Sequence, residues 1–234
     1  MRTLRLIFMA LSLVVSACSQ AGSSAGPTTA SYTTVDDAAT QLRADFNRQS
    51  GRVRLLFVVD PICPGCLRGL ADMNHDLLGG TADPRLQIFI VHEPVLGVAR
   101  YLPWLRIAGG RDVPKAASLI HNPNVHNYWN PTGSFGRLLS RAVGLENHGL
   151  RVYAWDVWLL YGPEAKWDSS GPPKPQLLMH QLSALRGNPQ FPHLDTRVFA
   201  ARVNALLARM PAAAQLRRQP PREVSAASVP LAVN

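Results

Sequence analysis

A Cys-x-x-Cys pair between a buried strand and a helix is the feature that most constrains how this chain can fold. Residues Val53–Val59 are mostly apolar or β-branched, which predicts a buried strand. Asp60-Pro61 ends that strand, because proline has no N–H to donate and restricts the residue before it. Behind the motif Cys63-Pro64-Gly65-Cys66, apolar residues recur at helical spacing at Leu67, Leu70, Met73 and Leu77. The stretch therefore predicts a strand, a sharp turn and a helix that begins at the motif.

The placement of the two cysteines has a chemical consequence. Their spacing brings the two sulfur atoms within one helical turn, near enough to form a disulfide. Cys63 falls at or just before the helix start, where unpaired N–H groups and the helix dipole stabilise a thiolate. Pro64 suits the first helical position, since its missing N–H costs nothing there. We expect Cys63 to be the nucleophile and the more exposed of the two cysteines, and Cys66, one turn further on, to be the buried resolving thiol.

The N-terminus has the pattern of an export signal. Arg2 and Arg5 precede the apolar run Leu6–Val15, which is too short to span a bilayer comfortably. The tetrapeptide Val15-Ser16-Ala17-Cys18 resembles the bacterial lipobox, and that resemblance implies lipidation of Cys18 after cleavage of residues 1–17. We expect a lipoprotein of the cell envelope that faces the periplasm, held on the outer or inner membrane through its lipid. An ordinary secretory signal is the alternative.

Composition divides the rest of the chain into three parts. Residues 18–34 are rich in Ser, Thr, Ala and Gly and predict a flexible tether behind the lipid. Residues 35–210 contain the periodic apolar segments and form the predicted domain. Residues 211–234, with Gln219-Pro220-Pro221-Arg222, are predicted to be disordered.

The net charge of +9 falls to +7 without residues 1–17, which hold two arginines and no acidic residue. The basic residues are scattered and no nucleic-acid motif accompanies them, so we expect no nucleic-acid partner.

The domain alternates between helical and strand patterns. Leu86–His92 predicts a second strand that runs parallel to the first, because a helix joins the two. The carboxyl ends of parallel strands meet at one sheet edge, so His92 and Glu93 should lie near Cys63. Gly162-Pro163-Glu164 should turn an apolar strand into an antiparallel partner at Ala165–Trp167. The further predicted elements are helices Val35–Gln49, Pro114–His121, Ser134–Val143, Gln176–Leu185 and Thr196–Arg209 (capped by Asp195), and strands Val125–Trp129 and Trp155–Tyr161.

This order of elements over Val35–Arg186 resembles the thioredoxin fold, in the extended form of membrane-tethered bacterial envelope thiol–disulfide oxidoreductases. Asp60-Pro61-Ile62-Cys63-Pro64-Gly65-Cys66 is also similar to the active-site stretch of periplasmic disulfide isomerases. The resemblance implies an α/β, three-layer domain with a central mixed sheet and a C-terminal antiparallel hairpin. It also implies exchange of the Cys63–Cys66 dithiol or disulfide with envelope proteins that carry thiols or disulfides, without a cofactor.

The chain departs from that family at two positions. The family has a cis-proline before its antiparallel strand, facing the disulfide, but no proline occurs in Gly149–Ala154. Ala154 or Trp155 stands nearest to that position, and we expect Trp155 to neighbour the disulfide. The tryptophan that precedes the first cysteine in many thioredoxins is replaced here by Ile62.

The residues near the motif admit more than one role. Asp60 could act as a turn former or as a catalytic acid. Glu93 could relay protons to Cys66 or could be a solvated carboxylate at the strand end. The cysteines themselves suit a redox dithiol, a structural disulfide, or a soft-metal site such as one for Cu(I). No second Cys pair exists, so a metal would need a histidine, with His92, His126 and His148 as candidates. We predict a redox dithiol and no bound metal, with a metal-binding or catalytically silent domain as alternatives.

Overall fold

The computed structural model describes residues 30–80, 82–95 and 106–212. The expected signal peptide, the lipidated Cys18 and nearly all of the expected C-terminal tail lie outside these residues. Within them, no helix is both long and apolar enough to cross a lipid bilayer.

The core of the fold is a twisted mixed sheet. Its strands, in spatial order, are β1 (Thr33–Thr34), β4 (Val125–Trp129), β3 (Leu86–His92), β2 (Val53–Val59), β7 (Val157–Tyr161) and β8 (Leu177–His180). The first four are parallel to one another, while β7 is antiparallel to β2 and β8 is antiparallel to β7. The α/β class, the mixed sheet and the parallel β2–β3 pair predicted from the sequence are therefore confirmed.

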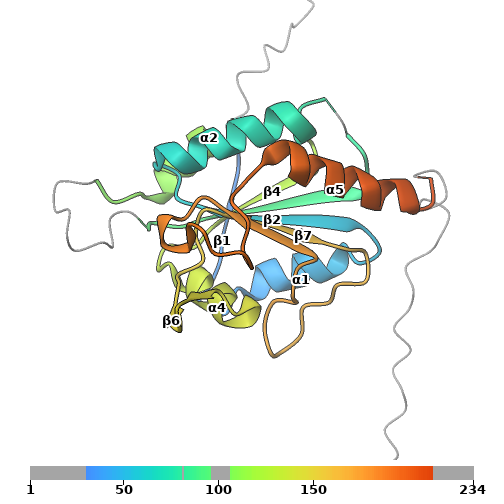
Figure 1. The fold of residues 1–234 in the computed structure, drawn as a ribbon. Coiled ribbons are helices and arrows are strands. Elements are labelled where there is room, and N and C mark those ends of the chain that lie inside the picture. The colour runs from blue at the N-terminus through green and yellow to red at the C-terminus, as the bar shows by residue number, and fades with distance from the viewer. Residues whose placement is uncertain (1–29, 81, 96–105, 213–234) are drawn as a thin grey trace, which may run out of the picture.

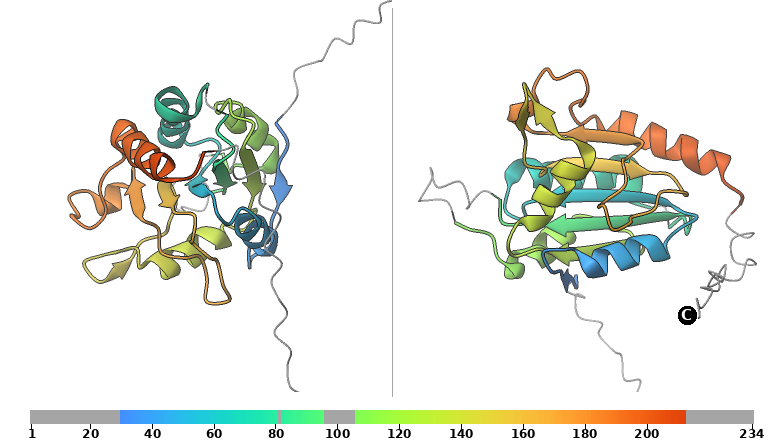
Figure 2. Two further views of the ribbon diagram at one scale, coloured as in Figure 1. Left: turned by 90° about the vertical axis from the view of Figure 1, so that its right-hand side faces the viewer. Right: turned by 90° about the horizontal axis from the view of Figure 1, so that it is seen from below.

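Helices cover both faces of the sheet, which makes three layers (Figure 1 and Figure 2). Helices α1 (Thr40–Arg48) and α4 (Ser134–Val143) lie on one face, and α2 (Pro64–Met73) and α5 (Thr196–Arg209) lie on the other. A π-helical turn, Asn74–Leu78, extends α2. The remaining elements are short: 3-10 turns Gly110–Asp112 and Ser183–Leu185, helix α3 (Val113–Ala117), and the hairpin of β5 (Glu146–Asn147) and β6 (Leu150–Arg151).

The two covered faces explain why β2 is apolar almost throughout. Leu56 and Val58 pack toward α1 and α4, whereas Leu55, Phe57 and Val59 pack toward α2 and α5. A parallel strand buried on both faces shows such a continuous apolar run instead of an alternating pattern.

Arg54 is the one charged residue of β2, and it is fully buried. Its guanidinium donates to the carbonyl oxygens of Phe46, Gly162 and Pro163 and lies 4.4 Å from the centre of the Phe46 ring. The charge is thereby hydrogen-bonded and stacked, as a buried charge must be.

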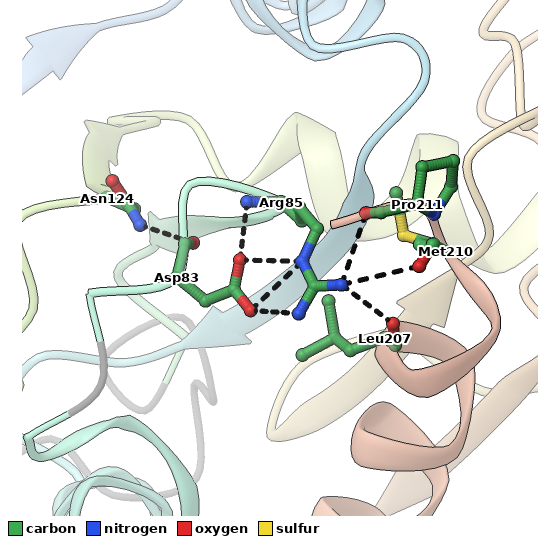
Figure 3. Close-up of polar contacts among 6 residues, drawn as sticks. All are labelled: Asp83, Arg85, Asn124, Leu207, Met210 and Pro211. Carbon is green, nitrogen blue, oxygen red and sulfur yellow. Dashed lines mark hydrogen bonds and ion pairs between the residues drawn. The ribbon is translucent and has the colours of Figure 1, made fainter. Parts of the chain in front are cut away.

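A polar clamp holds the end of α5 against the sheet (Figure 3). Arg85 pairs with Asp83 at 2.7 Å and donates through Nη1 to the carbonyl oxygens of Leu207, Met210 and Pro211. Leu207 lies in the last turn of α5, Met210 is its C-cap and Pro211 follows, so the guanidinium lies at the helix C-terminus, where a positive charge is favourable. The clamp fixes α5 over the face of the sheet that also carries α2.

Two predictions for the C-terminal half are wrong. The segment predicted as a helix over Gln176–Leu185 forms β8 at Leu177–His180 and a 3-10 turn at Ser183–Leu185. The spacing of its apolar residues is compatible with a helix or with a strand. The segment forms a strand because it can pair with the edge of β7 that β2 leaves free. For the same reason the antiparallel partner of β7 is β8 and not Ala165–Trp167.

Ala165–Trp167 is instead a loop fastened to α1. Asn47 donates from its side chain to the carbonyl oxygen of Trp167 at 2.7 Å and accepts the Trp167 N–H at 2.9 Å. The indole is buried among the apolar residues beneath α1 and α4. The aromatic residue thus serves the core without belonging to the sheet.

The N-terminal boundary also differs from the expected one. Thr33 and Thr34, which the sequence assigns to the tether, pair with Tyr128 and Trp129 of β4. Helix α1 begins only at Thr40, whose N–H is accepted by Asp36 Oδ1 at 2.8 Å. The sheet therefore extends one strand further toward the N-terminus than the apolar pattern indicates.

Candidate functional site

Cys63 is the N-cap of α2, as its position in the sequence predicts. Its backbone is extended, with φ −74° and ψ 119°, and its Sγ accepts the Cys66 N–H at 3.5 Å. Pro64 occupies the first turn of the helix, where no N–H is missed. Hydrogen bonding from the Cys66 side chain and from the backbone N–H groups of Cys66 and Gly65 lowers the pKa of Cys63 from 9.0 to about 7. Cys63 is thus an activated thiol at the N-terminus of α2.

Cys66 differs from Cys63 in burial and in acidity. Its side chain is fully buried, while Cys63 retains 7% of its surface. Burial raises the pKa of Cys66 well above 9.0, and the hydrogen bond to Cys63 and the charge of Asp156 raise it further. Both cysteines are free thiols. One thiol of the pair is therefore ready to react near neutral pH, and the other holds its proton.

Asp156 completes this group, although no motif in the sequence indicates it. The Sγ atoms of Cys63 and Cys66 and a carboxylate oxygen of Asp156 all lie within 4.8 Å of one another. Asp156 directly precedes β7 and takes a left-handed backbone with φ 49°, a conformation in which Asp is enriched. Its carbonyl oxygen accepts the Gln181 N–H at 3.0 Å, which ties this turn to the end of β8.

The Asp156 carboxylate is buried beside the thiols with one oxygen unpaired. Only 4% of the residue is exposed, and Oδ1 makes no hydrogen bond to any described residue. Burial raises the pKa of Asp156 to about 6. The carboxylate in turn opposes ionisation of both cysteines through its charge. A carboxyl group with a pKa of about 6 therefore lies next to the two thiols.

Asp60 shapes the turn that leads into the motif. Its Oδ1 accepts the Ile62 N–H at 2.9 Å, its Oδ2 accepts the Val95 N–H at 2.8 Å, and its carbonyl oxygen accepts the Cys63 N–H. These contacts are those of a turn former that also anchors the chain after β3. They hold Cys63 at the start of α2.

His92 ends β3, Glu93 follows it directly, and both are fully buried. His92 Nε2 lies 3.1 Å from Asn127 Oδ1, and burial lowers the His92 pKa to about 4. Glu93 accepts the Gly136 N–H at 3.0 Å and the Tyr153 hydroxyl at 2.7 Å, and burial raises its pKa to about 7. These hydrogen bonds of the two side chains therefore lead to β4, to α4 and to Tyr153, in the segment before β7, and none of them leads to a sulfur atom.

Trp155 is half-buried and packs against the apolar clusters on both faces of the sheet, one of which contains the two cysteines. Its neighbour Asp156 supplies the polar group beside the sulfur atoms. Pro64 is exposed and Gly65 half-buried, so the tip of the motif is open to solvent.

The donor set does not match the copper site considered from the sequence. Within the part of the chain that the structure describes, the group of possible ligands at the motif holds two thiols and one carboxylate, and no histidine joins it. A carboxylate is a poor ligand for Cu(I), which prefers thiolate, thioether and imidazole donors.

Neither a protein-family model nor a curated protein matches this chain. Among solved structures, a secreted disulfide oxidoreductase of Mycobacterium tuberculosis homologous to E. coli DsbE is 14% identical, over 68% of this chain and 85% of that one, with a TM-score of 0.38. A Neisseria meningitidis protein described as a thioredoxin is 14% identical (69% and 78% covered, TM-score 0.36). A yeast mitochondrial 1-Cys peroxiredoxin is 13% identical (70% and 68%, TM-score 0.41).

These values are too low to support an argument about function. The strand order β3-β2-β7-β8 and the helix that begins at Cys63-Pro64-Gly65-Cys66 decide the architecture. The fold is thioredoxin-like. Within this thioredoxin-like fold, Asp156 occupies the turn before β7, where the family would place its cis-proline, and none of the described peptide bonds is cis. A charged residue directly before the apolar strand Val157–Tyr161 is the signal by which the sequence could have revealed it.

Proposed function

We propose that this protein is an envelope thiol–disulfide oxidoreductase that exchanges its Cys63–Cys66 pair with partner proteins. The observation that carries the proposal is the difference in pKa between the two thiols of the pair. Cys63, as N-cap of α2, has a pKa near 7, whereas the pKa of the buried Cys66 lies well above 9.0. A structural disulfide alone would need no such difference.

The reaction follows from this difference. The Cys63 thiolate attacks a partner disulfide, the S–S bond of the partner breaks, and a mixed disulfide forms. Cys66 then attacks Cys63 Sγ, so that the Cys63–Cys66 bond forms and the second partner sulfur leaves as a thiolate. Two electrons pass from this chain to the partner, and the reverse sequence oxidises a partner dithiol. The sulfur atoms carry the electrons, so the reaction requires no cofactor.

The cellular setting of the proposal rests on the first residues of the sequence. A signal peptide over residues 1–17 and a lipidated Cys18 would place the domain in the cell envelope, where disulfides form and persist. Its partners would be envelope proteins that carry thiols or disulfides, reached from the membrane surface through the lipid and the tether.

Trapping of partners tests the proposal in cells. In the Cys66→Ala variant the mixed disulfide should persist, because the thiol that resolves it is gone. In Cys63→Ala few partners should be trapped, because the remaining thiol is buried and holds its proton. Non-reducing gels of the two variants, with the double variant as control, show the difference. If neither variant accumulates mixed disulfides, the proposal is wrong.

A further inference from the structure

The resolving step poses a problem of proton transfer. Cys66 must lose its proton before it can attack Cys63 Sγ, because the thiolate is the nucleophile. The residue is fully buried, and burial stabilises its protonated form. Bulk water therefore has poor access to this thiol, and a nearby group is needed to accept the proton.

The structure places one carboxylate against both sulfur atoms. Asp156 has a carboxylate oxygen within 4.8 Å of the Cys63 and Cys66 sulfurs, and a Cβ added at Gly65 would stand 3.5 Å from Asp156 Oδ2 and 3.7 Å from Cys63 Sγ. The carboxylate thus lies against the first turn of α2. The distance allows transfer through one water or after a small approach, and such contacts are often loose before the reacting complex forms.

The same carboxylate has spare hydrogen-bonding capacity. Its Oδ1 is buried and unpaired within the described part of the chain. A buried, unpaired polar atom costs free energy, and a catalytic role is one of the reasons for which such an atom is retained.

We propose, on the basis of the function proposed above, that Asp156 accepts the proton of Cys66 as that thiol attacks the mixed disulfide. The Cys66 S–H proton passes to a carboxylate oxygen of Asp156, the Cys63–Cys66 bond forms, and the bond from Cys63 to the partner breaks. The electron pair of the broken bond leaves with the sulfur of the partner. In the reverse reaction Asp156 returns the proton to Cys66.

The charged and titratable groups that act on Asp156 come from two sides. The two cysteines at the start of α2 lie against it, and hydrogen bonding with Trp158 and Cys66 lowers its pKa. The charge of His193, in the segment before α5, lowers the pKa further. Burial outweighs these effects and brings the Asp156 pKa to about 6. Near neutral pH the carboxylate is ionised and able to take a proton, as a general base requires.

The two chemical steps can be separated with 5,5′-dithiobis(2-nitrobenzoate) as the probe. Attack by Cys63 releases one thionitrobenzoate, and attack by Cys66 on the resulting mixed disulfide releases the second. The full-length chain carries Cys18→Ala, so that only the two motif thiols react. The first phase reports the activated thiol of the proposed function, and the second phase reports the resolving step alone.

In Asp156→Asn we expect the second phase to slow by about a hundredfold near neutral pH, the lower end of the range for loss of a general base. The first phase should keep its rate or become faster, because Asp156 opposes ionisation of Cys63. Asparagine tolerates the left-handed backbone of residue 156, and an unaltered first phase shows that the site is folded. Asp45→Asn, on α1 across the sheet, is the charge-matched control and should leave both phases unchanged.

A role as a fixed charge makes the opposite prediction. If Asp156 only repels the thiolates, its removal lowers the Cys66 pKa and speeds the second phase. A second phase in Asp156→Asn that is as fast as in the unsubstituted chain, or faster, therefore overturns the inference and leaves the proposed function intact.

The unsubstituted chain supplies an independent check. Its second-phase rate should rise with pH around a midpoint near 6, the pKa of Asp156. A rise only above pH 8.5 would contradict the inference even if Asp156→Asn failed to fold. A slow first phase without activation would instead contradict the proposed function.

Discussion

The indole of Trp158 packs directly on the backbone of Gly69. A Cβ added at residue 69 would stand 2.5 Å from Trp158 Cζ2 and 2.6 Å from Gln181 Oε1. Gly69 lies on α2 between Cys66 and Met73, and Trp158 is a fully buried residue of β7. Their contact sets how closely the helix that carries the cysteines approaches the strand that follows Asp156.

Gly69→Ala should therefore destabilise the domain by about 1–3 kcal/mol, the usual cost of overpacking, less the gain of about 1 kcal/mol in helix propensity. Equilibrium unfolding in urea measures the change. Gly65→Ala is the matched control in the same helix, because a Cβ there meets only ordinary contacts of 3.5 Å and more. Equal stability of Gly69→Ala and the unsubstituted chain would mean that α2 can move away from β7 freely.

Alkylation of Cys63 by iodoacetamide should show a pH midpoint near 7, measured in the Cys18→Ala background. The hydrogen bond from the Cys66 side chain is the largest cause of this low pKa. Cys66→Ala should therefore shift the midpoint upward, toward the value of 9.0 for an unperturbed thiol. A midpoint at or above ~8.5 in the unsubstituted pair would show that the helix start does not activate Cys63.

Glu93 should make the domain more stable in acid than at neutral pH. Its folded-state pKa, about 7, lies above the value of 4.5 in the unfolded chain, so the folded state binds more protons between these values. The contribution of Glu93 to the free energy of unfolding is present below pH 4.5 and is lost as the pH rises to about 7. The loss amounts to about a few kcal/mol at most.

Glu93→Gln keeps the acceptor for the Gly136 N–H and removes this titration. Asp156 and His92 also titrate on unfolding, so the informative quantity is the difference in unfolding free energy between the unsubstituted chain and Glu93→Gln at each pH. That difference should fall between pH 4.5 and 7. A difference in unfolding free energy that stays constant with pH would contradict the raised pKa of Glu93.

Membrane attachment should depend on Cys18. A lipobox without its cysteine has no thiol to acylate, so Cys18→Ala should move the protein from the membrane to the soluble fraction. Cell fractionation and immunoblotting measure this change, with Cys63→Ala as a control that keeps the lipobox. Retention of Cys18→Ala in the membrane fraction would show that another part of the chain binds the membrane.

Several elements of the fold can be predicted from local patterns in the sequence. β2, β3, β4 and α5 run between the residues predicted for them, because buried apolar runs and the Asp195 cap are local signals. Asp195 accepts the N–H groups of Arg197 and Val198 at 3.0 Å, as an N-cap should. The position of Cys63 at the start of α2 is local in the same way, since Pro61 and Pro64 place the strand end and the helix start around it.

Which strand edges pair, and which distant side chains meet, depends on how the elements pack together. Leu177–His180 becomes a strand because β7 offers an unpaired edge, and Thr33–Thr34 becomes one because β4 does. Asp156 meets the sulfur atoms of α2 across a sequence separation of 90 residues and more, at a turn whose backbone conformation no periodicity reveals. Its burial there, and the shifted pKa that follows, depend on the packing of α2 against β7, which no single segment of the sequence contains.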